Sequence, residues 1–257
     1  MDDIVRDSGN RDVRFAQADF ARLEDVRRLA AEVKASTPRL DVLVNNAGLI
    51  APRRTTTAEG FESTFAVNHL APFLLTLLLC EKLEHSVPAR IVIVASEAHR
   101  RSHLDFDDLM MAKRYSQFRA YGRSKLANIL FARALVRRLA GTAVTANALH
   151  PGLVRTNLFN GHSVLSRVGV ATIGRFFMIS SEEGAKTSLY LASSPEVEGR
   201  SGGYYSDCRL IEPSAAALKD EDGERLWAIS AKLVGLPESL PVGLVVSPSP
   251  GSPARPA

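Results

Sequence analysis

Three short and mainly apolar segments, separated by long segments with helical spacing, constrain the fold of this chain more than any other feature. The short segments are 41–45 (DVLVN), 90–95 (RIVIVA) and 143–149 (AVTANAL), and helices are predicted over 61–83 and 115–139. Strands that alternate with helices predict βαβ units and a parallel sheet. Because these strands are apolar on both faces, helices should cover both sides of the sheet. The sequence therefore predicts an α/β fold with a doubly wound parallel sheet.

The same reasoning assigns the rest of the chain to one domain followed by a tail. Further strands are predicted over 13–17 and 203–206, and further helices over 23–34, 182–192 and 223–234. No internal repeat interrupts the pattern, so we assign residues 1–236 to a single domain. Residues 237–257 are rich in Pro, Ser, Gly and Val, a composition typical of a disordered tail.

Charge and cysteine content argue against several other classes of protein. The net charge of +4 includes scattered basic pairs, such as Arg27-Arg28 and Arg137-Arg138, which indicates solvated surface rather than a nucleic-acid site. Weak attraction to an anionic membrane surface or to a phosphorylated cofactor stays open. Two cysteines cannot build a disulfide framework, so a reducing compartment is the simpler interpretation.

The chain shows neither a secretory signal nor a membrane span by composition. Its first ten residues are polar and acidic, unlike a signal peptide. The most apolar run, 70–80, contains Pro72 and is shorter than the roughly 20 residues that a spanning helix needs. We therefore expect a buried helix there.

Tyr121 and Lys125 indicate a specific chemistry. They lie four residues apart within a predicted helix, so their side chains share one face. A neighbouring cation favours the phenolate and lowers the pKa of a tyrosine, which is normally about 10. Such a phenol is a proton donor and acceptor near neutral pH, as the interconversion of alcohols and carbonyls requires. Alone, this spacing also occurs by chance on surface helices.

Other polar and small residues follow the strands, where a doubly wound sheet binds its ligands. They are Asn45, Ala47 and Gly48 after the first central strand, Ser96 after the second, Pro151, Gly152, Val154 and Thr156 after the third, and Asn68 in the helix between the first two. Each has an ordinary alternative, as a turn residue, a loop breaker or a polar helix residue. Their joint order along strands and helices favours a functional site.

These residues and the surrounding motifs resemble the short-chain dehydrogenase/reductase family, in its retinol-dehydrogenase branch. The motifs are VNNAG, FAVNHLAPFLLT, RIVIVASEAH, AYGRSKLANILFARAL and HPGLVRT, and the resemblance runs from about residue 2 to about 236. It implies a Rossmann-type sheet and an NAD(P)-dependent oxidoreductase that interconverts an alcohol and a carbonyl. The expected cofactor is NADP, with NAD as the alternative.

The resemblance also implies roles for the candidate residues. Tyr121 would be the general acid/base, Lys125 would bind the nicotinamide ribose, Ser96 would hold the substrate oxygen, and Asn68 would position a water. Asn45, Ala47 and Gly48 would line the cofactor site, Asp19 would contact the adenine, and Pro151, Gly152, Val154 and Thr156 would flank the nicotinamide. No metal site is expected, because His99 and His103 lie in a predicted loop without cysteines or carboxylates in metal spacing.

One part of the family pattern is not found in residues 1–257. The family begins with a strand, a TGxxxGxG turn and a helix, whose backbone N–H groups hold the cofactor pyrophosphate. Here the strand predicted over 13–17 matches the family's third, so we expect a sheet truncated at the N-terminus, without its first two strands. Strand 41–45 would then present an open, aggregation-prone edge. Two explanations compete. One is an incomplete gene model or splice form of a normal enzyme, which we favour, and the other is a short protein that folds poorly or has a non-catalytic role.

The sequence indicates the class of substrate but not the exact substrate or the localisation. Segment 158–180 is rich in apolar residues and corresponds to the family's substrate cover, which favours a lipophilic, retinoid-like or lipid substrate; packing on the core or a membrane is the alternative. The alternative function is a non-catalytic chain, either without a stable fold or acting as a dimer partner through helices 61–83 and 115–139. The localisation is unknown: cytoplasmic, or associated with the endoplasmic-reticulum membrane in a full-length parent.

Overall fold

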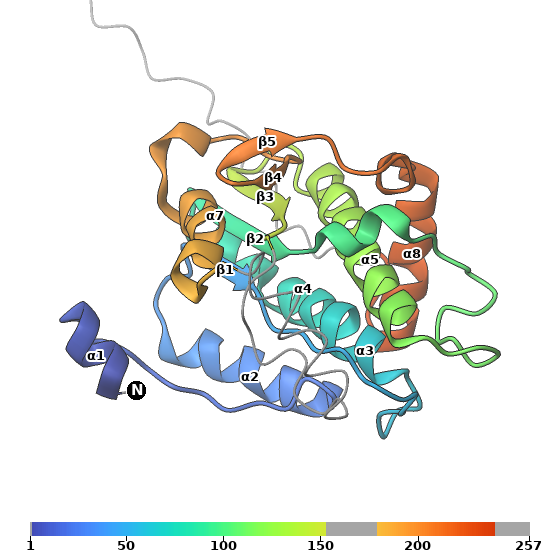
Figure 1. Ribbon diagram of the computed structural model, residues 1–257. Coiled ribbons are helices and arrows are strands. Elements are labelled where there is room, and N and C mark those ends of the chain that lie inside the picture. Colours follow the sequence, from blue (N-terminus) through green and yellow to red (C-terminus); the bar gives the residue numbers. More distant parts are fainter. Residues whose placement is uncertain (1, 153–178, 240–257) are drawn as a thin grey trace, which may run out of the picture.

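A five-stranded sheet forms the centre of the molecule. The computed structural model describes residues 2–152 and 179–239. Its strands lie in the order β1 (Val42–Asn45), β2 (Ala89–Val94), β3 (Val144–Leu149), β4 (Tyr204–Ser206) and β5 (Arg209–Ile211) (Figure 1). The first four are parallel and β5 is antiparallel to β4. The α/β prediction and the three central strands are therefore confirmed.

Helices cover both faces of this sheet. In chain order they are α1 (Asp2–Ser8), α2 (Leu23–Ser36), α3 (Ser63–Phe65), the π-helical turn η1 (Ala66–Leu70), α4 (Ala71–Glu84), the 3₁₀ turn η2 (Glu97–Arg101), α5 (Gln117–Arg138), α7 (Ser181–Ser193), the 3₁₀ turns η4 (Pro195–Val197) and η5 (Ala215–Leu218), and α8 (Asp220–Val234). Successive residues of β2 point to opposite faces. Ile91 and Ile93 therefore pack in the core with α4 and α5, while Val92 and Val94 pack with Leu191 of α7.

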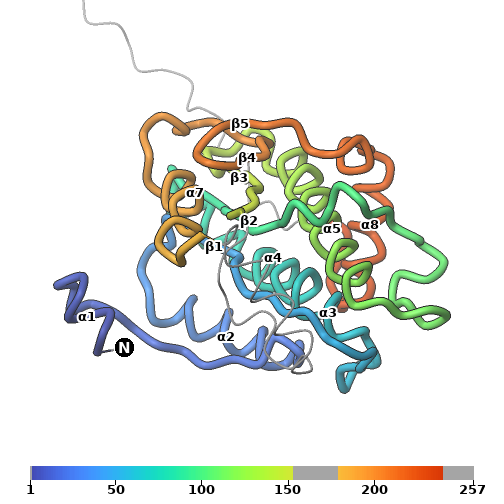
Figure 2. Tube along the Cα trace, viewed as in Figure 1, coloured from blue at the N-terminus to red at the C-terminus, as the bar shows by residue number. Residues whose placement is uncertain are grey.

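The segment predicted as a strand over 13–17 is not a strand, and this prediction is wrong. The segment runs beside α2 (Figure 2). The Arg14 side chain donates to the Ser36 carbonyl, and Arg28 Nη2 donates to the Gln17 carbonyl at 2.6 Å. A strand needs a neighbouring strand for its backbone hydrogen bonds, and here the neighbour is a helix. The edge strand β1 leaves Val44 41% exposed, as expected for an edge with a partner on one side only.

Helix α8 covers the outer face of α4 and α5. Trp227 is fully buried, with its ring centroid 5.0 Å from Phe73 and 5.9 Å from Phe131, and the Arg138 guanidinium lies 3.9 Å from its centroid. The helix ends at Gly235, whose φ of +68° is the left-handed conformation that glycine adopts without strain. Helix α8 is thus held against α4 and α5 by aromatic packing within the same chain.

The continuous helical stretch Ser63–Glu84 is long and apolar enough to cross a membrane. In this structure 89% of its most apolar 18-residue window is buried inside the protein. Cys80 and Leu83 are among its fully buried residues, packed between β1, β2 and the surrounding helices. The sequence prediction of a buried helix over 70–80 is confirmed.

Candidate active site

The carboxyl ends of β1, β2 and β3 meet at one edge of the sheet, because the three strands are parallel and in register. Ser96 lies just beyond β2 and is the N-terminal capping residue of η2. Its Oγ accepts a hydrogen bond from the Ala98 N–H at 3.2 Å, which leaves the hydroxyl proton of Ser96 available to donate. The local sequence therefore directs a hydroxyl group to the edge where a ligand would bind.

Helix α5 brings Tyr121 and Lys125 to the same edge. Lys125 is buried, its Nζ donates to the Val94 carbonyl at 2.9 Å, and it lies 5.6 Å from the centroid of the Tyr121 ring. The Ser96 hydroxyl lies close enough to the Tyr121 phenol to lower the pKa of the phenol. The structure thus brings together Ser96, Tyr121 and Lys125, as the sequence predicted.

The pKa of Tyr121 differs from the sequence-based expectation. Burial raises the pKa of the phenol, and the hydrogen bond from Ser96 opposes this rise. The expectation was that Lys125 lowers it, but Nζ is directed at the Val94 carbonyl rather than at the phenol oxygen. Burial also lowers the pKa of Lys125 itself to about 8. In this arrangement desolvation outweighs the attraction between the two groups.

Replacing Lys125 by methionine is expected to stabilise the ligand-free protein below pH 8. The unfolded chain holds the Lys125 proton more tightly than the folded chain does, so a charged Lys125 lowers the free energy of unfolding by about 3 kcal/mol. This loss of stability is complete below pH 8 and disappears as the pH rises toward 10.5. Asn128 Nδ2 also donates to the Val94 carbonyl, at 3.3 Å, and keeps that carbonyl bonded.

Urea unfolding of Lys125→Met and wild type between pH 7 and 9.5 measures this effect. The stability difference between them should shrink as the pH rises. The same substitution at the exposed Lys232 is the control and should show no such trend. A Lys125→Met difference that is constant across this range contradicts the prediction.

Asn68 lies in the π-helical turn and holds the chain after β1. Its Oδ1 accepts from the Leu49 N–H at 2.8 Å, and its Nδ2 donates to the Leu49 carbonyl and to Ser124 Oγ, both at 2.9 Å. Ser124 in turn donates to the Tyr121 carbonyl at 2.8 Å. Ser124 is a site residue that the sequence reasoning did not identify, although its place between Tyr121 and Lys125 was a signal.

The turn after β1 leaves its backbone open to a ligand. Ala47 and Gly48 are exposed, and a Cβ added to Gly48 would lie 3.3 Å from Asn68 Oδ1 and 3.4 Å from Lys125 Nζ. A side chain here would crowd the space above these two polar groups. Asn45 is different, because it is buried and its Nδ2 donates to Thr76 Oγ1 at 2.8 Å, so its side chain supports the turn from within.

The remaining predicted residues are placed as follows. Asp19 is exposed just before α2, where its Oδ1 accepts from the Ala21 N–H at 2.9 Å, a local turn contact. Pro151 and Gly152 follow β3, and Gly152 has φ +82°, a conformation that favours glycine. Val154, Thr156 and most of the apolar segment 158–180 lie outside the described residues.

These residues fit one half of a nicotinamide dinucleotide. The open backbone at Gly48, the buried Lys125 ammonium and the Tyr121 phenol suit a nicotinamide ribose, whose hydroxyls need donors and close backbone approach. Among residues 2–152 and 179–239, no strand–glycine turn–helix unit precedes β1 to hold the pyrophosphate. The described residues likewise contain no cluster of three or more potential metal ligands.

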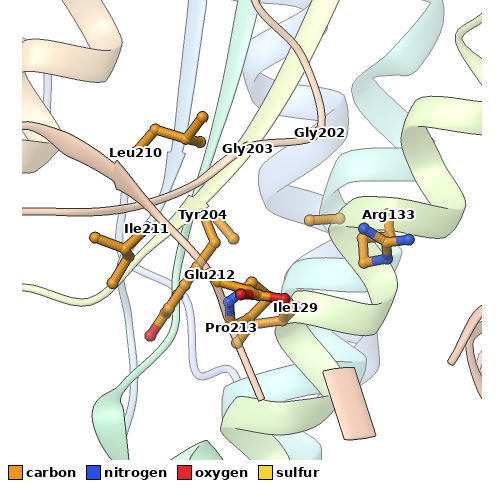
Figure 3. Close-up of a pocket in the computed structure, with 11 residues that line it drawn as sticks. Ile129, Arg133, Gly202, Gly203, Tyr204, Leu210, Ile211, Glu212 and Pro213 are labelled. Atoms are coloured by element: carbon orange, nitrogen blue, oxygen red, sulfur yellow. The ribbon is translucent and has the colours of Figure 1, made fainter. Parts of the chain in front are cut away.

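A pocket of about 350 Å³ lies elsewhere, between α5 and the β4–β5 hairpin (Figure 3). Ile129 and Arg133 line it from α5, and Ile211 and Pro213 line it from the other side. None of Ser96, Tyr121 and Lys125 lines it. The pocket is therefore separate from the candidate active site.

Comparison with known proteins is consistent with this site. The family model for short chain dehydrogenases matches residues 2–163. Human Retinol dehydrogenase 14 is 46% identical over 231 residues, which cover 89% of this chain and 69% of that protein. Dehydrogenase/reductase SDR family member 13 from Bos taurus is 42% identical over 237 residues, which cover 91% of this chain and 62% of that protein. The chain thus spans about two thirds of these relatives.

Solved structures give the same result. A putative uncharacterized protein from Mycobacterium Paratuberculosis has a TM-score of 0.69 and 31% identity, covering 88% of this chain and 76% of that one. The Pseudomonas aeruginosa RhlG/NADP active-site complex has a TM-score of 0.60 and 25% identity, covering 79% and 78%. The fold and the residues at its carboxyl edge define an α/β oxidoreductase. The chain belongs to the short-chain dehydrogenase family.

Proposed function

We propose that this chain carries the catalytic groups of an NADP-dependent oxidoreductase that interconverts an alcohol and a carbonyl on a lipophilic, retinoid-class substrate. The observation that carries the proposal is the Ser96–Tyr121–Lys125 arrangement at the carboxyl edge of β2. It places a hydroxyl, a phenol and a buried ammonium at one point of the sheet edge, where ligands of doubly wound sheets bind.

The phenol of Tyr121 is the proposed general acid/base. In carbonyl reduction it gives its proton to the substrate oxygen, and in alcohol oxidation it takes the proton back. Lys125, fixed by the Val94 carbonyl, supplies positive charge one helical turn away. In the ligand-free chain burial raises the pKa of the phenol, and the Ser96 hydroxyl opposes that rise.

Ser96 is the proposed donor to the substrate oxygen. Its Oγ accepts from the Ala98 N–H, so its single proton points away from the backbone. In the ligand-free chain this proton faces the Tyr121 phenol, and in the proposed reaction it is donated to an oxygen on which charge develops. Asn68 is buried and bonded to both backbone groups of Leu49, and it keeps the Ala47–Gly48 backbone facing the site. Asn68 is also the residue proposed to position a water for proton transfer.

The cofactor and substrate rest on the relatives. A bound nicotinamide dinucleotide supplies the hydride, with Tyr121, Lys125 and Gly48 holding its ribose. NADP is preferred because a solved relative is an NADP complex. A retinoid-class substrate is proposed because relatives at 42–46% identity are named retinol dehydrogenases. We also propose that the apolar segment 158–180 covers the lipophilic substrate. A full-length parent protein would be associated with a membrane.

Incubation with all-trans-retinal and deuterium-labelled NADPH tests the proposal. We expect deuterium on the alcohol carbon of the product, and slower turnover when NADH replaces NADPH. Ser96→Ala should reduce product formation, while the substitution of the exposed Ser193 by alanine should not. A folded chain that neither binds NADPH in calorimetry nor forms product contradicts the proposal and favours a non-catalytic partner role.

A further inference from the structure

His99 is buried directly behind Ser96, and both of its ring nitrogens are bonded to backbone groups. Nδ1 lies 2.7 Å from the Ser96 carbonyl oxygen, and Nε2 lies 3.1 Å from the Ser214 nitrogen. Its solvent exposure is 0%. This histidine was considered as a metal ligand from the sequence, but a metal would need a nitrogen that these bonds already use.

The two partners determine the tautomer of the ring. The Ser96 carbonyl can only accept, so Nδ1 must carry the hydrogen and donate it. The Ser214 N–H can only donate, so Nε2 must present its lone pair. His99 is therefore a neutral imidazole, in keeping with the lowering of its pKa by burial.

The surroundings of the ring leave it little freedom to move. The Tyr204 ring lies edge-on at a centroid distance of 5.1 Å, and the Tyr204 hydroxyl is 3.4 Å from Nδ1. The titratable groups nearby are Glu97, Arg100 and His150. The Glu97 carboxylate pairs with Arg100 at 2.6 Å and lies 3.2 Å from His150 Nε2, whose pKa is lowered by burial. The ring joins η2 to β4 and to the start of η5.

We propose that His99 is a positioning residue for the reaction, acting through Ser96. The hydrogen bond from His99 to the Ser96 carbonyl fixes the backbone of Ser96, whose side chain faces the Tyr121 phenol. The hydrogen bond from the Ser214 N–H to His99 connects this backbone to a segment 115 residues further along the chain than His99. His99 touches neither the phenol nor a substrate in this arrangement. The expected effect of His99 on turnover rests on the proposed function. The expected effect of His99 on the Tyr121 phenol does not, because it can be measured in the ligand-free chain.

The first measurement is the titration of Tyr121 in the ligand-free protein. The ¹³Cζ signal of labelled tyrosine, assigned with Tyr121→Phe, reports the pKa of the phenol, and circular dichroism confirms folding at each pH. Ser96→Ala removes a hydrogen bond that favours the phenolate, so it should raise this pKa by about 0.5 to 1. His99→Phe should raise it by a comparable amount, and the double variant should show no further rise.

Two variants separate positioning from a loss of packing. Phenylalanine keeps the ring and its contact with Tyr204 but loses both hydrogen bonds. In His99→Asn the amide Nδ2 takes the place of Nδ1 and can still donate to the Ser96 carbonyl, so the titration of Tyr121 should return close to that of wild type. His103 is exposed and lies four residues further along, and His103→Phe is the matched control, with no expected change.

The kinetic measurement uses the same variants with NADPH and retinal. His99→Phe should lower kcat by about 10-fold with KM unchanged, and the effect should be absent in a Ser96→Ala background. An unchanged Tyr121 titration in His99→Phe, or effects of His99→Phe and Ser96→Ala that add fully, would overturn the inference. If the titrations behave as expected but no turnover exists, the positioning role stands and the proposed function fails.

Discussion

Replacement of Tyr121 by phenylalanine is expected to lower kcat by about 10²- to 10⁴-fold, the usual contribution of a positioned general acid/base. The substitution removes a single oxygen and keeps the ring beside Lys125 and the hydrophobic packing of α5. The lost group is the general acid/base that the proposal assigns to the reaction. The rate is measured as product formed from retinal and NADPH at saturation, with folding verified by circular dichroism.

Tyr115→Phe provides the control for Tyr121→Phe. Tyr115 lies just before the same helix, and its hydroxyl donates to the Ala51 carbonyl at 2.7 Å, a contact within the scaffold. Its loss should cost roughly 1 kcal/mol of stability and leave kcat close to wild type. Turnover within about 3-fold of wild type in Tyr121→Phe would refute the acid/base assignment, whatever the stability of the variant.

Replacement of Trp227 by alanine is expected to lower the free energy of unfolding by about 3 to 5 kcal/mol, as for other fully buried tryptophans. The ring fills the space between Phe73, Phe131 and the Arg138 guanidinium, and its Nε1 donates to the Glu238 carbonyl at 2.8 Å. The alanine variant would leave a cavity here and remove the main packing contact of α8 with α4 and α5. Urea denaturation followed by circular dichroism measures the loss.

The ion pairs on the same helix provide a comparison for Trp227. Glu224 accepts from Arg137 at 2.7 Å and from Arg138 at 2.6 Å, but its side chain is 45% exposed. Solvent and salt screen such pairs, so Glu224→Gln should cost roughly 1 kcal/mol or less. If Glu224→Gln proves as costly as Trp227→Ala, then charge rather than burial attaches α8, contrary to our interpretation.

The elements that sequence reasoning predicted are those with a strong local pattern. Strands β1, β2 and β3 are apolar on both faces, and α5 repeats its apolar residues at helical spacing, so each could be assigned without knowing its neighbours. The hairpin strand β5 was not predicted. Its turn uses Asp207 and Cys208 at φ +49° and +57° in place of the usual Asn-Gly, and the strand itself is largely exposed.

The failures share one physical cause, which is dependence on distant partners. Segment 13–17 has the composition of a strand but lies against a helix, and only the tertiary arrangement decides between the two. Ser124 and His99 acquire their roles from Asn68 and Ser214, which are 56 and 115 residues away in the chain. The raised pKa of Tyr121 likewise depends on burial, which the spacing of two residues does not contain.

The π-helical turn at Ala66–Leu70 gives the long apolar helix two rotational phases. The wider turn contains one more residue than an α-helical turn, so the residues that precede it and those that follow it are rotated against each other. Within this turn Asn68 bonds the chain after β1, while the next residue, His69, meets Ser230 of α8 at 2.9 Å. Two attachments, one to the chain after β1 and one to α8, thus meet in this turn, so a substitution that changes its width should disturb both.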